Sequence, residues 1–229
     1  CCQKALSLKP DDPDLLQNLA VAYEKKGDMD NLINLYNKIL KFNINNHKIY
    51  VVLSNVYFQM ENFDKAVECC QKALKLKPNF AEAYLNMGNA YKYKKDLKAA
   101  LNCFKRAYEI KPDFADAHFN FATTHLLNGN LEKGFKEYEW RFKRDLQIHP
   151  EISISKPMWD GSSLENKTIL ICYEQGFGDS LQFARYLPLL AEMGAKVLVK
   201  LQTPLEKLFE QSDLKATVVK AKFLKDFPH

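Results

Sequence analysis

A glycine-containing turn in the last third of the chain has residue types suited to anion binding and acid–base chemistry. The residues EQGFGDS (174–180) follow an apolar run, KTILICY (167–173), and precede a pattern typical of a helix. A helix N-terminus attracts anions, and glycine lets a ligand approach the backbone. Asp179 could serve as a general base or as the cap of that helix. A dinucleotide fingerprint is not indicated, because Leu181 replaces the third glycine of G-x-G-x-x-G and Gln202 stands where an acid is required.

Asparagines recur at long, regular intervals in the first part of the chain. The positions spaced by 34 residues are Asn18, Val52, Asn86 and Asn120. An amide offers both a donor and an acceptor, so a row of amides can hold an extended peptide backbone whatever its sequence. Asn55 and Asn89 can add to the row, and Val52 interrupts it. The alternative is that these asparagines are solvated helix residues in an asparagine-rich chain.

Metal binding is not indicated by the histidines or the cysteines. His118 and His125 lie seven residues apart on one helical face, but they occupy positions that are normally aromatic core sites of the repeat, so we expect packing. The six cysteines form no C-x-x-C pair and accompany no histidine cluster of zinc spacing. We therefore expect no metal site, and reduced, mostly buried thiols of a cytoplasmic protein.

The elements that carry the asparagines repeat every 34 residues. The decapeptide CCQKALSLKP (1–10) recurs as CCQKALKLKP (69–78) and as CFKRAYEIKP (103–112). In phase with them, small residues recur where two helices must cross closely: Ala20, Ser54, Gly88 and Ala122. The pattern predicts a partial repeat over 1–12 and full repeats over 13–46, 47–80, 81–114 and 115–148. Each repeat reads as a helix–turn–helix pair, and one pair buries its apolar face only by stacking on its neighbours.

This period and pattern resemble the tetratricopeptide repeat, or TPR. The resemblance implies an α-solenoid with a concave groove that binds a peptide or protein partner, and the asparagine row faces that groove. The row resembles the asparagine ladder of the O-GlcNAc transferase superhelix, whose repeats are similar to AYLNMGNAYK (83–92). The array looks capped after FKEYEWRFKRD (135–145), where Arg141 stands at a position that is small in two of the other repeats.

The remainder of the chain predicts a linker and an incomplete α/β domain. Residues 149–166 lose the helical period and contain two prolines and a Gly-Ser-Ser run. The predicted order over 167–229 is β-α-β-α-β, which implies a parallel, Rossmann-like sheet. Its strands are 167–173, 195–202 and 216–221, and its helices are 180–194 and 203–212. Pro188 lies inside the first helix, and Thr203 is the expected N-cap of the second.

Residues 135–229 closely resemble the segment after the repeats of bacterial TPR–glycosyltransferase proteins, which have a GT-B fold and are related to heptosyltransferases. The most specific part is EQGFGDSLQFARYLPLL. The resemblance implies that Asp179 deprotonates an acceptor hydroxyl and that Gly176 and Gly178 form the loop around the acceptor. It nominates three further residues for that site: Glu174, Gln175 and Arg185.

Two functions from different classes remain open. In the first, the repeats recruit an acceptor and the intact protein transfers a sugar to it from a nucleotide-sugar held by a second domain. These 229 residues then lack that domain and are inactive alone, with no cofactor of their own. In the second, the chain is a non-catalytic peptide-binding or assembly protein with a structural α/β tail. Evenly spread charge argues against nucleic acid, and no apolar run suits membrane insertion.

Overall fold

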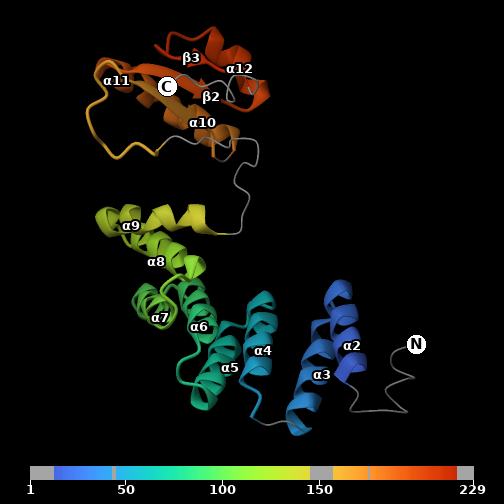
Figure 1. Ribbon diagram of the computed structural model, residues 1–229. Coiled ribbons are helices and arrows are strands. Elements are labelled where there is room, and N and C mark those ends of the chain that lie inside the picture. Colours follow the sequence, from blue (N-terminus) through green and yellow to red (C-terminus); the bar gives the residue numbers. More distant parts are fainter. Residues whose placement is uncertain (1–12, 43–44, 145–156, 175, 221–229) are drawn as a thin grey trace. The chain divides into compact units, whose positions relative to one another are not determined.

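The computed structural model describes residues 13–42, 45–144, 157–174 and 176–220 (Figure 1). The chain divides into two units, Cys1–Asp145 and Leu146–His229, here named the repeat unit and the α/β unit. None of the helices in the described ranges has the length and apolar character that a membrane crossing needs. The predicted partial repeat 1–12 and Gln175 lie outside the described residues.

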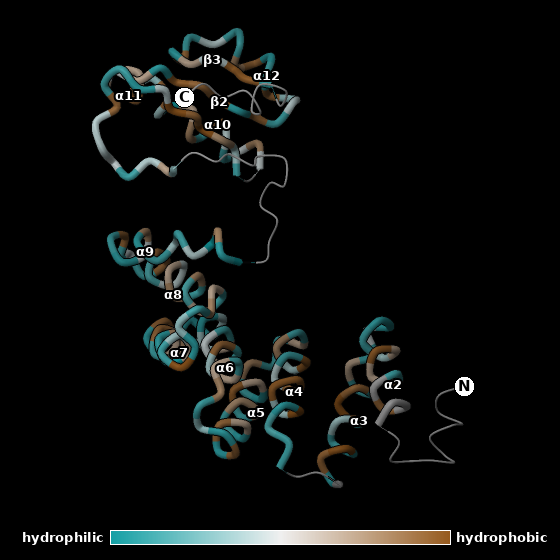
Figure 2. The backbone as a smooth tube through the Cα atoms, viewed as in Figure 1, coloured by the Kyte–Doolittle hydropathy of each residue, from teal (hydrophilic) through white to brown (hydrophobic). Residues whose placement is uncertain are grey.

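The described part of the repeat unit consists of consecutive helix pairs, which confirms the predicted helical solenoid (Figure 1). The first helices of the pairs are α2 (Pro13–Lys26), α4 (His47–Gln59), α6 (Ala81–Tyr93) and α8 (Ala115–Leu127). The second helices are α3 (Met29–Phe42), α5 (Phe63–Leu76), α7 (Leu97–Ile110) and α9 (Leu131–Tyr138). Polar and apolar residues alternate along these helices in Figure 2, as expected for helices with one buried face.

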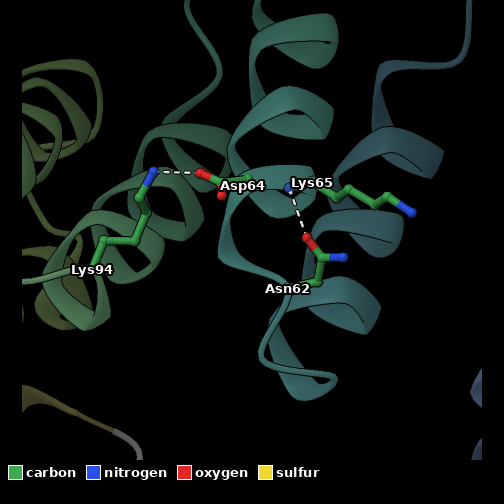
Figure 3. Close-up of polar contacts among 4 residues, drawn as sticks. All are labelled: Asn62, Asp64, Lys65 and Lys94. Atoms are coloured by element: carbon green, nitrogen blue, oxygen red, sulfur yellow. Dashed lines mark hydrogen bonds and ion pairs between the residues drawn. The ribbon is translucent and has the colours of Figure 1, made fainter.

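The turn inside each pair has one recurring geometry. Gly27 and Gly129 adopt positive φ there, and Glu61 and Lys95 adopt the same left-handed conformation at the equivalent positions. The next helix then begins with a polar N-cap. Asn62 accepts from the backbone N–H of Lys65 at 3.2 Å (Figure 3), and its counterparts in the following pairs are Asp96 and Asn130.

Small residues permit close contact between the helices of a pair, as the sequence predicts. A Cβ atom on Gly88 would lie 2.5 Å from Cε1 of Phe104, whose side chain is fully buried. Alanines fill the other tight contacts and are completely buried: Ala73, Ala83, Ala90, Ala100, Ala107, Ala117 and Ala122. The thiols of Cys69, Cys70 and Cys103 are free and buried, in agreement with the packing role expected of them.

The last pair departs from the others, as the sequence indicates. Helix α9 has only 8 residues and continues as the 3-10 helix η1 (Glu139–Lys143). Arg141 stacks on the ring of Phe142, with 3.9 Å from Cζ to the ring centroid, and its Nη1 donates to Glu139 Oε1 at 2.8 Å. The guanidinium therefore lies against local aromatic and acidic groups.

The α/β unit contains a three-stranded parallel sheet in the order β1-β2-β3. The strands are β1 (Thr168–Cys172), β2 (Lys196–Lys200) and β3 (Thr217–Val218), and Leu170 is paired with Leu198 in the register. Apolar side chains from the strands pack with Leu187 of α11 (Leu187–Glu192) and with Leu205 and Phe209 of α12 (Thr203–Glu210). Leu164, from the segment expected to be a linker, belongs to this core.

Two expectations about the helices of this unit are wrong. The single helix predicted over 180–194 is three segments: α10 (Phe177–Phe183), η2 (Ala184–Tyr186) and α11 (Leu187–Glu192). The break has a physical cause, because Pro188 lacks a backbone N–H and is tolerated in the first turn of α11, where it lies. Helix α12 begins at Thr203 itself, and its N-cap is Gln202.

Candidate functional site

The first helices of successive pairs carry a polar surface that we call the A-helix face. It consists of side chains at and between the contacts of α4 with α6 and of α6 with α8. Its members are Asn55, Asn86, Asn89, Lys92, Asn120 and Thr123, and all of them are half-exposed or exposed. Two of the residues, Lys92 and Thr123, were not singled out by the sequence pattern.

At the contact of α4 with α6, two of the predicted asparagines meet. Asn86 Nδ2 donates to Asn55 Oδ1 at 2.7 Å and to Ser54 Oγ at 3.1 Å. Ser54 is buried, and its hydroxyl donates to the carbonyl oxygen of Val51 at 2.7 Å. Because Asn86 uses only its amide nitrogen, its amide oxygen makes no hydrogen bond among the described residues. Ser54 thus holds the amide nitrogen of Asn86, and the amide oxygen of Asn86 remains available to a ligand.

At the contact of α6 with α8, a lysine provides the side-chain hydrogen bond between the two helices. Lys92 Nζ donates to Thr123 Oγ1 at 3.0 Å, and the Thr123 hydroxyl donates to the carbonyl oxygen of Asn120 at 3.2 Å. Burial lowers the pKa of Lys92, because desolvation disfavours the ammonium form. Within the described residues, no carboxylate lies at ion-pair distance from this ammonium group.

The remaining asparagines are placed differently. Asn120 Nδ2 donates to the carbonyl oxygen of Asp116 in its own helix at 3.0 Å. Asn89 is half-exposed on α6 and makes no side-chain hydrogen bond within the described ranges, and Asn18 is exposed on α2. Val52, which interrupts the row, is 37% exposed. The structure therefore joins Asn55 and Asn86 by a hydrogen bond, whereas none of the hydrogen bonds among the described residues joins Asn18, Asn89 or Asn120 to that pair.

Aromatic and ionic contacts fix the edge of this face. The ring of Tyr93 meets that of Phe58 edge-on, with 4.9 Å between centroids, and lies 5.5 Å from that of Phe63. Lys94, at the end of α6, pairs with Asp64 at the start of α5 (Figure 3). These contacts connect α4, α5 and α6, the helices around the amide pair.

The two histidines have packing roles, as predicted. His118 is stacked between Tyr108, at 4.4 Å between centroids, and Trp140, at 3.8 Å. Its Nδ1 lies 2.7 Å from Glu137 Oε2, and its Nε2 lies 3.1 Å from the carbonyl oxygen of Pro112. His125 is buried, and that desolvation lowers its pKa. No group of three potential metal ligands occurs in the described part of the chain.

Comparison with known proteins identifies the helical part. A family model described as TPR repeat matches residues 55–94 and 88–129, and one described as tetratricopeptide repeat matches 1–31. The repeat unit contains tetratricopeptide repeats. The chain is 38% identical over 71 residues to protein FlbA of Caulobacter vibrioides, and this match covers 31% of the chain and 12% of FlbA.

Solved structures share the fold of this TPR array. A crystal structure of MamA is 20% identical, with a TM-score of 0.55, and the match covers 62% of this chain and 83% of MamA. A second MamA crystal structure is 26% identical with a TM-score of 0.51, covering 57% and 71% of the two chains. A thermophilic TPR protein of Thermus thermophilus, TTC0263, is 20% identical with a TM-score of 0.53, covering 63% and 79%.

The glycine turn lies between β1 and α10 in the α/β unit. Gly176 is the N-cap of α10, Gly178 lies in its first turn, and Glu174 is half-exposed just after β1. Asp179 is the third residue of α10, so the interpretation that it caps this helix is wrong. Its carboxylate turns back toward the helix start, since Oδ2 would lie 3.8 Å from a Cβ atom on Gly176. Arg185 is exposed, and its guanidinium lies 5.0 Å from the ring centroid of Tyr186.

Two further side-chain contacts lie at the carboxyl ends of the strands. Ser180 Oγ donates to Gln202 Oε1 at 2.9 Å, which connects α10 to the residues after β2. Lys200, the last residue of β2, forms a buried ion pair with Glu206 of α12 at 3.1 Å. The sequence pattern did not find this ion pair, because Lys200 reads as one more exposed lysine beside an apolar strand.

Proposed function

We propose that the TPR array is a protein-interaction scaffold that binds an extended peptide along the A-helix face. The observation that carries the proposal is the amide pair of Asn55 and Asn86, which is anchored by Ser54 and keeps hydrogen-bonding groups on its outer side. Such a pair can recognise a peptide backbone without reading its sequence.

The chemistry requires a donor and an acceptor at a fixed separation. The free amide oxygen of Asn86 can accept from a peptide N–H, and the amide nitrogen of Asn55 can donate to a peptide carbonyl. Asn89 offers both groups on the same helix. Because Ser54 and Asn55 already hold the amide of Asn86, little side-chain entropy is lost when a peptide binds.

The test is peptide binding by the full chain and by an Asn55→Ala/Asn86→Ala variant. The probe is a library of short peptides, acetylated and amidated at their ends, and bound peptides are quantified by mass spectrometry. Asn102, which is exposed on α7 away from the A-helix face, provides the matched control as Asn102→Ala. We expect the double variant to lose at least about tenfold in affinity and the control to lose none. Equal binding by all three proteins would refute this role.

The α/β unit supports a second candidate, a glycosyltransferase-like acceptor site in a Rossmann-like domain. The observation in its favour is the glycine turn beside the carboxyl end of β1, where open α/β sheets commonly bind ligands, with the Asp179 carboxylate directed back over it. In the intact protein, Asp179 would take the proton of an acceptor hydroxyl as its oxygen bonds to the sugar carbon. The nucleoside diphosphate leaves as that bond forms.

This second candidate is tested in the intact protein by sugar transfer from nucleotide-sugars. Asp179→Asn should reduce kcat by about 10²–10⁴, the usual contribution of a general base. The exposed Asp213 provides a control as Asp213→Asn, which should not change kcat. Normal turnover of Asp179→Asn would favour the alternative, a non-catalytic TPR protein whose α/β unit is structural.

A further inference from the structure

Lys92 differs from three other lysines of the described residues in the kind of group that its ammonium contacts. It is half-buried at the contact of α6 with α8, and its one side-chain hydrogen bond to the described residues is to a neutral hydroxyl, that of Thr123. Lys94 pairs with Asp64, Lys200 with Glu206 and Lys215 with Glu192. An ammonium group has three N–H donors, so two donors of Lys92 remain for water or for a ligand.

The position of Lys92 carries a free-energy cost that the protein itself does not offset. Burial of the ammonium lowers its pKa, and within the described residues no carboxylate compensates the charge. Asp116, on the adjacent helix α8, is already paired with Arg144, whose Nε lies 2.7 Å from Asp116 Oδ1. A half-buried ammonium group that has a neutral hydroxyl but no internal carboxylate as its partner is a candidate for binding a carboxylate of a ligand.

Lys92 lies on the same helix, α6, as the asparagines Asn86 and Asn89. Residues along an α-helix are separated by about 100°, so Asn89 lies roughly midway around α6 between Asn86 and Lys92. Asn86 contacts α4 and Lys92 contacts α8, so Asn89 lies on the part of α6 between these two contacts. The rise from Asn86 to Lys92 is about 9 Å, which corresponds to roughly three residues of an extended peptide.

We propose that Lys92 binds the side-chain carboxylate of an aspartate or glutamate in an extended peptide held along the A-helix face. This inference rests on the proposed peptide-binding function and specifies its partner. The amides of Asn55, Asn86 and Asn89 bind the peptide backbone, and Lys92 selects an acidic residue about three positions away. A side-chain carboxylate suits the site better than a chain terminus, because one ammonium supplies the charge and the described residues place no set of convergent backbone N–H groups beside it.

The experiment compares matched peptides on the full, unmodified chain. Acidic peptides selected from the acetylated and amidated library are resynthesised with each Glu replaced by Gln or each Asp by Asn, and their affinities are measured by fluorescence anisotropy. We expect one acidic position to be enriched, and its amide replacement to weaken binding by about tenfold or more. The preference should also decline as salt concentration rises.

Substitutions at Lys92 test whether this residue causes the preference for acidic peptides. Lys92→Met should abolish the difference between acidic and amide peptides, whereas Lys92→Arg should retain it and the exposed Lys98→Met should not affect it. Lys92→Met should leave the melting temperature unchanged or raised, because it removes a desolvated charge. A lysine with a purely structural role would instead lower it.

The possible failures are distinguishable. If no peptide binds, the proposed function fails and the inference fails with it. If peptides bind through Asn55 and Asn86 but show no acidic preference, or if Lys92→Met keeps that preference, only the inference is overturned. If peptides with free C-termini bind better than amidated ones and the internal acid is irrelevant, the carboxylate is terminal and the inference is again wrong.

Discussion

Replacing Gly88 by alanine should destabilise the repeat unit, although alanine is the better helix former. A new Cβ atom would lie 2.5 Å from Cε1 and 2.7 Å from Cδ1 of Phe104. The ring of Phe104 is fully buried and cannot swing into solvent. Forcing an extra carbon into a packed core costs about 1–3 kcal/mol, while the gain in helix propensity is about 1 kcal/mol. The expected net loss is therefore about 1 kcal/mol, with an upper limit of about 2 kcal/mol.

The assay is urea unfolding followed by far-ultraviolet circular dichroism, with a second substitution to identify the clash. Phe104→Leu makes room for the new methyl group, so Gly88→Ala should cost less in the Phe104→Leu background than in the wild type. Gly178→Ala provides a control, since an added Cβ there meets no atom within 4 Å. Wild-type or higher stability of Gly88→Ala would refute the reasoning, because the close crossing of α6 and α7 would then tolerate a side chain.

Three other predictions concern buried groups. His118→Ala should reduce the free energy of unfolding by about 2 kcal/mol, because it removes the ring contacts with Tyr108 and Trp140 and two hydrogen bonds. A change below about 0.5 kcal/mol, measured by urea unfolding, would contradict this. Burial raises the pKa of the Cys70 and Cys103 thiols from 9.0 to about 12, so these thiols ionise at lower pH in the unfolded chain than in the folded one. The free energy of unfolding should therefore fall as pH rises from 9 toward 12. A free energy of unfolding that does not change over this range, or rapid alkylation of the native protein, would contradict the prediction. Lys200→Met should cost about 3 kcal/mol by stranding Glu206, and adding Glu206→Leu should restore most of that loss in thermal unfolding.

The regular parts of the fold follow from local patterns in the sequence. Gly27 and Gly129 mark the turns because only a left-handed residue closes them, and Asn62 and Asp96 follow as helix caps. The small residue at position 88 is predictable because the residues at the equivalent positions of the other repeats are also small. The parallel strand order follows from the alternation of strands and helices.

The parts that the sequence did not predict depend on contacts between distant residues or on competition between local signals. The partnership of Asn86 with Asn55 requires the stacking of α4 on α6 and is not visible in the row of equivalent positions. Lys92 resembles its neighbours Lys94 and Lys95 in sequence, and only packing against α8 distinguishes it. In the α/β unit, the apolar periodicity indicated one helix, whereas Pro188 required a new helix start.

The amide pair between α4 and α6 has a consequence for how such an array can change length in evolution. Asn120 occupies in its repeat the place that Asn86 occupies in the preceding one, and KPNF before α6 matches KPDF before α8. A recombination event that excised residues 81–114 would join equivalent positions and bring Asn120 opposite Asn55. Loss of this one period would therefore preserve an asparagine pair between neighbouring first helices, while it would remove Lys92, which has Leu126 as its counterpart in the next repeat.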